Sequence, residues 1–145
     1  MIALLQRVNW ARVSIEGETR AQIDKGLLVL LGLEKEDDEG KADKLLHKLL
    51  NYRVFADADG KMNLSLLDIE GGLLLVSQFT LAATTDKGLR PGFSSAMPPE
   101  QAQPLYDYLV AQAGKHGLRL GTGEFGADMK VALENDGPVT FSLRA

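Results

Sequence analysis

Cysteine is absent from the sequence. A chain without cysteine forms no disulfide scaffold, no zinc–thiolate or iron–sulfur site and no cysteine nucleophile. Histidine is scarce as well, because His47 and His116 are the only two. General bases for an ordinary hydrolase are therefore few. The lack of cysteine is compatible with a reducing cytoplasm, where we expect the protein to act.

Long hydrophobic segments are also missing. The longest apolar run, Leu27 to Leu33, is far shorter than the roughly 20 residues that a membrane-spanning helix needs. Residues 1–7 lack the basic region and the long apolar region of a signal peptide. We therefore expect a soluble protein that does not enter a membrane.

The sequence has no excess of positive charge. Sixteen Lys and Arg against twenty Asp and Glu give a net charge of −4. Binding of nucleic acid by overall charge is thereby excluded, so any such contact has to come from a local basic patch. What the sequence does contain is 145 residues with 45% hydrophobic content, which is typical of one globular domain spanning 1–145.

Short apolar runs and apolar alternation predict most of the strands. Residues 11–23 alternate about a turn and predict a β-hairpin. Residues 27–31 and 73–76 are continuous apolar runs, typical of strands that are buried on both faces. The last two strands are expected at 127–134 and 139–143, on either side of a turn.

Two segments have helical periodicity. The first follows the acids Asp37-Asp38-Glu39, which are suited to cap a helix, and it repeats apolar residues from Ala42 to Leu50 at helical spacing. The second begins at Pro99 or Gln103 and runs to Lys115, with Pro104 either bending it or marking its first turn. These elements together predict a mixed α/β fold in which antiparallel-rich sheets pack against two main helices.

No common catalytic motif is present. The sequence has no G-x-S-x-G elbow, no H-E-x-x-H, no Gly-rich phosphate loop and no carboxylate–histidine cluster with metal spacing. His47 lies on the polar face of the first helix. His116 follows the second helix, at the C-terminal end where a cation interacts favourably with the helix dipole. We therefore expect neither a metal nor a cofactor.

Two other segments are unusual for their positions. Ser77-Gln78-Phe79-Thr80-Leu81 places three polar residues at the end of a buried strand. Asn135-Asp136-Gly137-Pro138-Val139-Thr140 places Gly-Pro between two strands, which by turn chemistry alone indicates a hairpin turn. The long irregular segment 82–98 is the third candidate, because loops of this length in a compact domain are often functional.

The S-Q-F-T-L and N-D-G-P-V-T segments, in this order and spacing, resemble those of the D-aminoacyl-tRNA deacylases of the D-Tyr-tRNA deacylase type. The similarity covers the whole chain, including Lys87-Gly88 and Arg90-Pro91 in the loop and the segment Gly123 to Met129. It implies a three-layer β/β/α homodimer that cleaves the ester between a D-amino acid and the terminal adenosine of tRNA. The family also removes glycine mischarged onto alanine tRNA.

The resemblance also implies roles for residues. Ser77, Gln78, Phe79 and Thr80 would line the pocket for the adenosine and the scissile carbonyl. Gly137 and Pro138, joined by a cis peptide, would reach into the pocket of the other subunit and reject L-amino acids. Glycine has no Cβ, so its backbone can approach a ligand closely, and an L side chain would collide with that backbone.

The chemistry of the reaction leaves alternatives. The substrate carries a vicinal 2′-hydroxyl that can assist hydrolysis, with the protein supplying orientation and backbone N–H groups around Gln78 to Thr80 for the oxyanion. Alternatively, Thr80 is the nucleophile of a small-molecule esterase, or the chain is a dimeric nucleic-acid-binding module without turnover. Lys87 and Arg90 are the first candidates for contacts with tRNA phosphates.

Overall fold

One long strand organises the sheet in the computed structural model, which describes residues 1–145. β1 (Ile2–Ile15) pairs along one edge with β3 (Gly26–Gly32) and then with β2 (Glu18–Ile23), and along its other edge with β8 (Lys130–Arg144). These pairings are all antiparallel. β6 (Gly72–Ser77) adds to β3 in parallel, and β7 (Leu120–Thr122) adds to β6. The antiparallel-rich mixed sheet expected from the sequence is confirmed.

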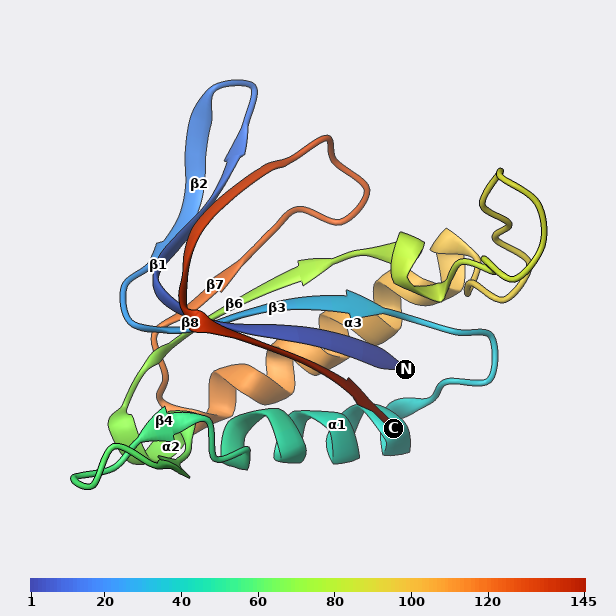
Figure 1. Cartoon of the computed structure of the whole chain (residues 1–145). Helices are drawn as coiled ribbons and strands as arrows, with labels where there is room; N and C mark the ends of the chain where they lie inside the picture. Colours follow the sequence, from blue (N-terminus) through green and yellow to red (C-terminus); the bar gives the residue numbers. More distant parts are fainter.

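The sheet bends, so the molecule has three layers (Figure 1). The second half of β1, β2 and the beginning of β8 lie over one face of β3 and β6, while α1 (Glu39–Asn51) and α3 (Pro99–Ala113) cover the other face. Along β3, Leu27 and Val29 join the core under the helices, whereas Leu28 joins the smaller core between the two sheet layers. β3 and β6 are therefore buried on both faces, as their continuous apolar runs indicate.

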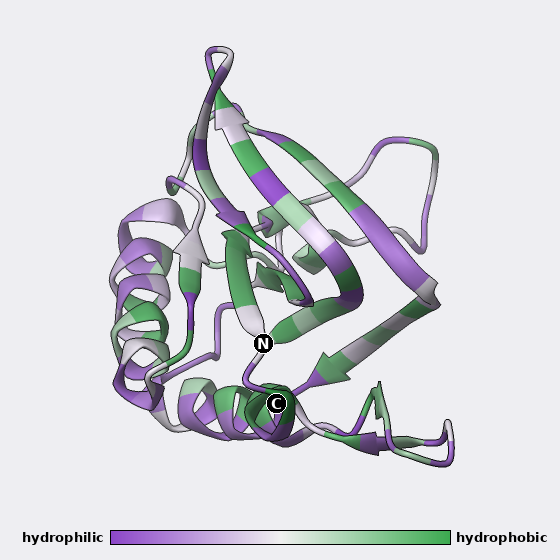
Figure 2. Ribbon diagram, turned by 90° about the vertical axis from the view of Figure 1, so that its left-hand side faces the viewer, coloured by the Kyte–Doolittle hydropathy of each residue, from purple (hydrophilic) through white to green (hydrophobic).

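The two helices form close to the positions that their periodicity predicts. Asp38 caps α1, because its side chain accepts a hydrogen bond from the Lys41 N–H at 2.9 Å. Asp37 does not cap the helix; its carboxylate binds the α-ammonium of Met1 at 2.6 Å. α3 begins at Pro99 and ends at Ala113, so Pro104 lies inside it. Figure 2 shows hydrophilic and hydrophobic residues alternating along both helices.

Several short elements carry no clear pattern in the sequence. β4 (Phe55–Ala56) and β5 (Met62–Leu64) form a small separate hairpin, followed by α2 (Leu66–Ile69). η1 (Phe79–Ala82) follows β6, and η2 (Gly114–His116) follows α3. None of the helices combines the length and the apolar character that a membrane crossing requires.

The expected hairpin at 135–138 is wrong. β8 is one strand that pairs with β1 on both sides of this segment, through Gln6 with Thr140 and Val8 with Asn135. Between these two pairs Arg7 alone faces residues 136–139, so the chain bulges outward without reversing. The reason is the length of β1: both halves of β8 pair with it, so β8 continues in one direction past the bulge. We call residues 136–139 the bulge.

Candidate active site

The polar segment Ser77–Thr80 begins where β6 leaves the sheet. Ser77 pairs with Leu31 as the last residue of the strand, and the Gln78 N–H donates to the Leu31 carbonyl at 2.7 Å. η1 then turns the chain immediately, so the strand does not continue to Leu81. The segment therefore lies at the C-terminal end of β6, where its side chains are half-buried or exposed.

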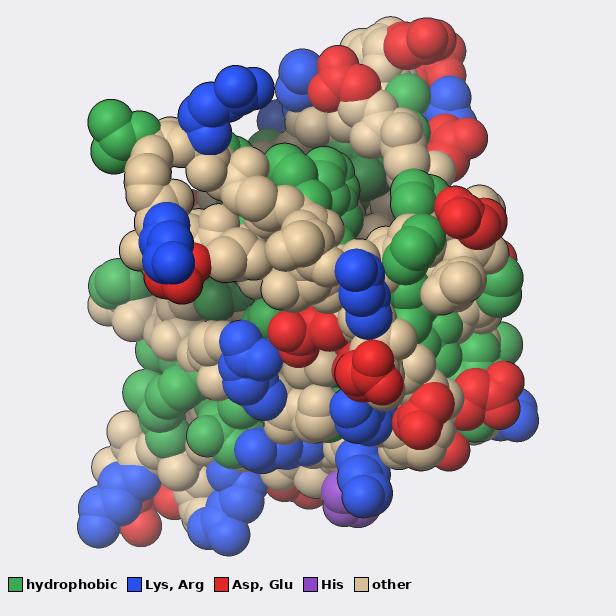
Figure 3. All heavy atoms as spheres, turned by 90° about the vertical axis from the view of Figure 1, so that its right-hand side faces the viewer, with side chains coloured by type: hydrophobic (Ala, Val, Ile, Leu, Met, Phe, Trp, Pro, Cys, Tyr) green, Lys and Arg blue, Asp and Glu red, His purple; other side chains and the backbone are tan.

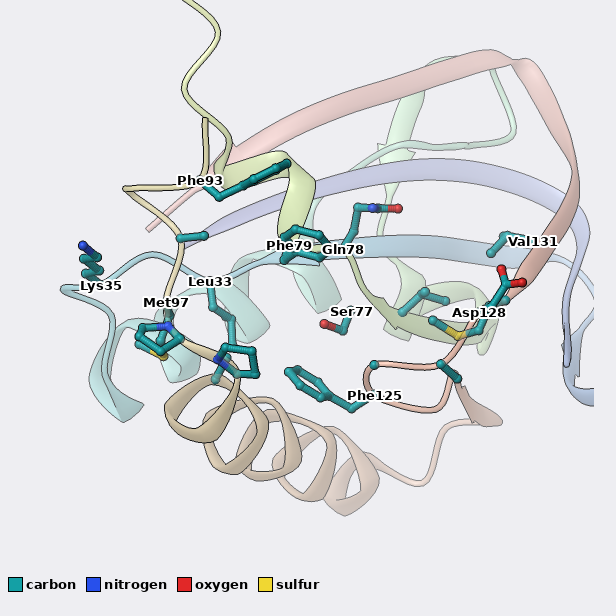
Figure 4. Close-up of a pocket in the computed structure, with 18 residues that line it drawn as sticks. Leu33, Lys35, Ser77, Gln78, Phe79, Phe93, Met97, Phe125, Asp128 and Val131 are labelled. Carbon is teal, nitrogen blue, oxygen red and sulfur yellow. The ribbon is translucent and has the colours of Figure 1, made fainter. Parts of the chain in front are cut away.

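A cavity of about 760 Å³ opens in front of this segment. Ser77, Gln78 and Phe79 line it, whereas Thr80 does not (Figure 4). Its other walls come from residues 33–35, the loop 93–98, the start of α3 and the segment 125–131, including Met97, Phe125, Asp128 and Met129. Lys35 and Asp128 are the only charged residues among the eighteen that line it. The cavity is thus mainly apolar, with a few polar groups at the strand end.

Three phenylalanine rings form part of the cavity wall. The Phe79 side chain is 57% exposed, and its ring lies 5.1 Å from the ring of Phe93, measured between centroids. Phe125 lies on the α3 side, facing the region of Ser77 (Figure 4). Flat apolar walls of this kind suit a nucleobase, since stacking of a base on an aromatic ring contributes about 1–3 kcal/mol.

Thr80 has no base beside it. Its hydroxyl accepts a hydrogen bond from the Gln78 amide nitrogen Nε2 at 2.6 Å. Neither histidine lines the cavity, because His47 is on the exposed face of α1 and His116 is in η2. The structure contains no group of three or more His, Asp or Glu side chains placed to hold a metal ion.

The Gly137–Pro138 peptide is cis, as the resemblance implies, and it lies in a bulge that the rest of the chain fixes. Arg7 Nε donates to the Asp136 carbonyl at 3.2 Å, and Arg7 Nη1 donates to the Val54 carbonyl at 2.8 Å. The Arg7 guanidinium also forms an ion pair with the Asp136 carboxylate at 3.2 Å. The Arg7 side chain is only 15% exposed, whereas that of Asp136 is 42% exposed, so water reaches the ion pair from the Asp136 side.

Asn135 closes the bulge from the other side. Its Nδ2 donates to the carbonyls of Arg7 and Val139, each at 3.0 Å. The Thr140 hydroxyl in turn donates to Asn135 Oδ1 at 3.1 Å. Asn135 thereby replaces ladder hydrogen bonds that the bulge interrupts, a local role typical of asparagine side chains.

The backbone conformation and the packing around position 137 both require glycine. Its φ is +122°, a region that residues with side chains rarely adopt. A Cβ at this position would lie 2.8 Å from Val139 Cγ2 and 3.0 Å from Arg7 Nη2. The bulge itself therefore requires glycine here, apart from any approach of a ligand.

The cavity and the bulge do not meet within one chain. Ser77 pairs with Leu31, Leu31 pairs with Ala3, and Arg7 lies four residues farther along β1, beside the bulge. Three strand spacings across the sheet and four residues along it give a separation of about 20 Å. Gly137 and Pro138 are both exposed.

Lys87 and Arg90 lie in an exposed arm that the Thr84–Gly92 bridge closes. Neither forms an ion pair, and neither lines the cavity. Figure 3 shows a hollow with hydrophobic side chains on this side of the molecule, with Lys, Arg, Asp and Glu side chains intermixed below it. Sequence reasoning did not identify Lys35 and Met97 as lining residues, because nothing in their sequence context marks them.

Known proteins resemble this chain over its whole length. Residues 4–144 match the family model described as D-Tyr-tRNA(Tyr) deacylase. A protein of Stutzerimonas stutzeri named D-aminoacyl-tRNA deacylase is 63% identical over 100% of both chains, and one of the same name from Aeromonas hydrophila is 62% identical over 99% of both.

Solved structures agree in fold. One described as c-Myc DNA Unwinding Element Binding Protein superposes with a TM-score of 0.95 at 42% identity, covering 100% of this chain and 99% of that one. Another, described as a probable eukaryotic D-amino acid tRNA deacylase, has a TM-score of 0.84 at 16% identity and covers 98% of both chains. The second supports the fold alone.

Proposed function

The chain belongs to the D-Tyr-tRNA(Tyr) deacylase family, and from this premise we propose that it hydrolyses the ester between a D-amino acid and the 3′-terminal adenosine of tRNA. We extend the proposal to glycine mischarged onto alanine tRNA, because a filter for chirality does not exclude an achiral residue. The observation that carries the proposal is the aromatic-walled cavity at Ser77 and Gln78.

The cavity suits the terminal adenosine and its ester. Phe79 and Phe93 offer ring surfaces to the adenine, and Ser77 and Gln78 offer polar groups at the strand end. Because Gln78 Nε2 is engaged by Thr80, its Oε1 remains as an acceptor for a ribose hydroxyl. The ester carbonyl would then lie close to the start of η1.

The hydrolysis uses the substrate's own hydroxyl. Water adds to the ester carbonyl, the bond from the carbonyl carbon to O3′ breaks, and O3′ receives a proton, so that free D-amino acid and tRNA leave. The 2′-hydroxyl assists this proton transfer, since no protein base lies beside Thr80. A backbone N–H stabilises the oxyanion. Because the Gln78 N–H already binds Leu31 and Thr80 does not line the cavity, this role falls to the N–H of Phe79.

Selection against L-amino acids comes from a second subunit. The exposed bulge carries Gly137 and Pro138 about 20 Å from its own cavity, so it is available to the cavity of a partner. In the homodimer, backbone carbonyls of the bulge face the substrate's α-ammonium and Cα. A D side chain points away from this wall, whereas an L side chain collides with it.

The reaction takes place in the cytoplasm, needs no metal or cofactor, and has tRNA as its macromolecular partner. Lys87 and Arg90 contact the tRNA backbone near its end, since both are exposed and free of carboxylates. Few phosphate contacts are needed when only the end of the acceptor strand is bound, which fits the net charge of −4.

Two other functions make different predictions. An esterase with Thr80 as nucleophile cleaves both D-Tyr-tRNA and L-Tyr-tRNA. A nucleic-acid-binding module cleaves neither, and the name of the 42% identical solved structure favours testing it. Incubating the two aminoacyl-tRNAs separately with the protein distinguishes the three, because only the proposed deacylase cleaves the D form alone.

A further inference from the structure

Tyr106 places a buried hydroxyl directly behind the candidate active site. It lies in α3, the helix whose first residues line the cavity, and is only 3% exposed. Its hydroxyl donates to the Leu75 carbonyl at 3.0 Å. Burial, together with the charge of Asp107, raises the pKa of Tyr106 to about 12, so the hydroxyl remains a protonated donor at neutral pH.

The Leu75 carbonyl connects three parts of the chain, because it accepts hydrogen bonds from α3 and from the segment after β7. It belongs to β6, two residues before Ser77, and it also accepts a hydrogen bond from the Gly123 N–H at 2.9 Å. Tyr106 therefore joins α3 to the strand that carries Ser77 and to the segment that leads to Phe125. A Cβ at Gly123 would lie 2.7 Å from Met129 Sδ, so this segment is closely packed.

The tyrosine ring reaches a cavity wall as well. Its centroid lies 5.9 Å from that of Phe125, with the two ring planes tilted by 45°. Phe125 lines the cavity on the side facing Ser77 (Figure 4). One side chain thus contacts both the strand end and the aromatic wall of the site.

The position of this hydrogen bond along β6 is informative. The pairing of β6 with β7 ends at Leu75 and Thr122, whereas its pairing with β3 continues to Ser77. Beyond Leu75 the strand therefore has one neighbour and an open edge towards the cavity. Tyr106 binds the last carbonyl before this open edge, where a packing residue such as phenylalanine would fill the space without restraining the strand.

We propose that Tyr106 is a positioning residue for the deacylation, whose hydroxyl fixes the strand end bearing Ser77 and Gln78 while its ring fixes Phe125. The inference rests on the proposed function, because it concerns the orientation of the ester in that cavity. Small errors of orientation are costly, since a displacement of about 1 Å can reduce a rate by about 100-fold.

The test compares Tyr106→Phe with Tyr108→Phe in the full-length protein. Tyr108 lies two residues away on the same helix, and its hydroxyl donates to Asp43 Oδ1 at 2.9 Å on the exposed side, so it is a matched control. For Tyr106→Phe we expect kcat on D-Tyr-tRNA to fall by about tenfold. KM should stay within about twofold, because the ring still fills the same space. Tyr108→Phe should behave as the wild type.

Melting temperatures separate positioning from folding. Tyr106→Phe should melt within a few degrees of the wild type, because the Gly123 N–H still satisfies the Leu75 carbonyl. An unchanged kcat, or an effect on KM alone, would overturn the inference. If Tyr106→Phe does not fold, Phe125→Leu decides: it keeps the hydroxyl bond and should also lower kcat, and an unchanged kcat would again overturn the inference. A wild type that leaves D-Tyr-tRNA intact would overturn the proposed function and the inference together.

Discussion

The cavity and the bulge differ in how firmly the chain holds them. Segment 77–80 makes a single side-chain hydrogen bond, between Gln78 and Thr80, and much of its surface faces open space. The bulge is fixed by Arg7, Asn135 and Thr140 through several hydrogen bonds and an ion pair. In the proposed function, the cavity is an open receptor with apolar walls, and the bulge is a rigid insert from the partner subunit.

Under the proposed function, this difference corresponds to two separate tasks. Recognition of the adenosine needs a concave apolar surface, and it does not involve the amino acid's side chain. Rejection of an L-residue needs an obstacle that does not yield, because a flexible wall would move aside at little cost. A filter made of backbone ignores the chemistry of the side chain, so the proposed function implies that many D-amino acids are accepted.

Gly137→Ala should have the largest effect, because it changes the rigid region itself. A side chain at φ +122° costs about 1–3 kcal/mol in strain, and the new Cβ meets Val139 and Arg7. We expect a Tm lower by several degrees and deacylation of D-Tyr-tRNA reduced by at least about tenfold. Gly60→Ala, at a φ of +78° with no neighbour within 4 Å and outside the cavity, controls for backbone strain alone. Normal activity of Gly137→Ala would show that the bulge has no part in the site.

Mixed dimers test whether the two regions act across subunits. One chain carries Ser77→Ala and Gln78→Ala, and the other carries Gly137→Ala; each variant alone should be nearly inactive. A mixed dimer keeps one intact site, so it should recover about half of the wild-type activity. Purification through two different affinity tags isolates the mixed species. Inactive, well-folded mixed dimers would mean that both regions serve the same subunit's cavity.

Periodicity predicted the parts of the fold that depend on local pattern. The helix of Ala42 to Leu50 and the two-sided burial of β3 follow directly from the spacing of apolar residues. The segments 77–80 and 135–140 are unusual for their positions in the sequence, but their roles came only from a resemblance, since neither contains a recognisable catalytic group. Their contacts within the chain then emerged from the structure.

What the sequence could not predict depends on contacts between distant residues. Gly-Pro after alternating residues indicates a turn, but whether the chain reverses is decided by β1, whose fourteen residues pair with both halves of β8. Arg7 lies 129 residues before Asp136, and no local pattern links them. The lining residues Lys35 and Met97 meet the site through the bridge between Glu34 and Ala96, which is equally non-local.

Lys87 and Arg90, in the exposed arm closed by the Thr84–Gly92 bridge, test whether tRNA phosphates are bound outside the cavity. Replacing both with alanine should weaken binding of full-length aminoacyl-tRNA by severalfold. It should also reduce the slope of log affinity against log salt by about one for each phosphate that the variant no longer neutralises. Hydrolysis of a short D-aminoacyl-adenosine, which has no phosphates, should not change. The matched control is Lys44→Ala with Lys48→Ala on the exposed face of α1. An equal reduction on both substrates would place these residues in the folding of the loop and not in binding of tRNA.

Thr80→Ala should have the smallest effect of all. Its hydroxyl accepts from Gln78 and has no base to activate it, so the substitution removes one hydrogen bond worth about 1 kcal/mol, or at most about fivefold in rate. Removal of a true nucleophile costs far more, about 10⁶-fold in a serine protease. The decisive companion is a substrate whose terminal ribose is 2′-deoxy and aminoacylated at the 3′ position, which the wild type should hydrolyse far more slowly. Inactive Thr80→Ala together with normal hydrolysis of the deoxy substrate would mean that Thr80 supplies the reacting group. The cavity would then do more than bind the substrate, and the division of tasks between the cavity and the bulge would no longer hold.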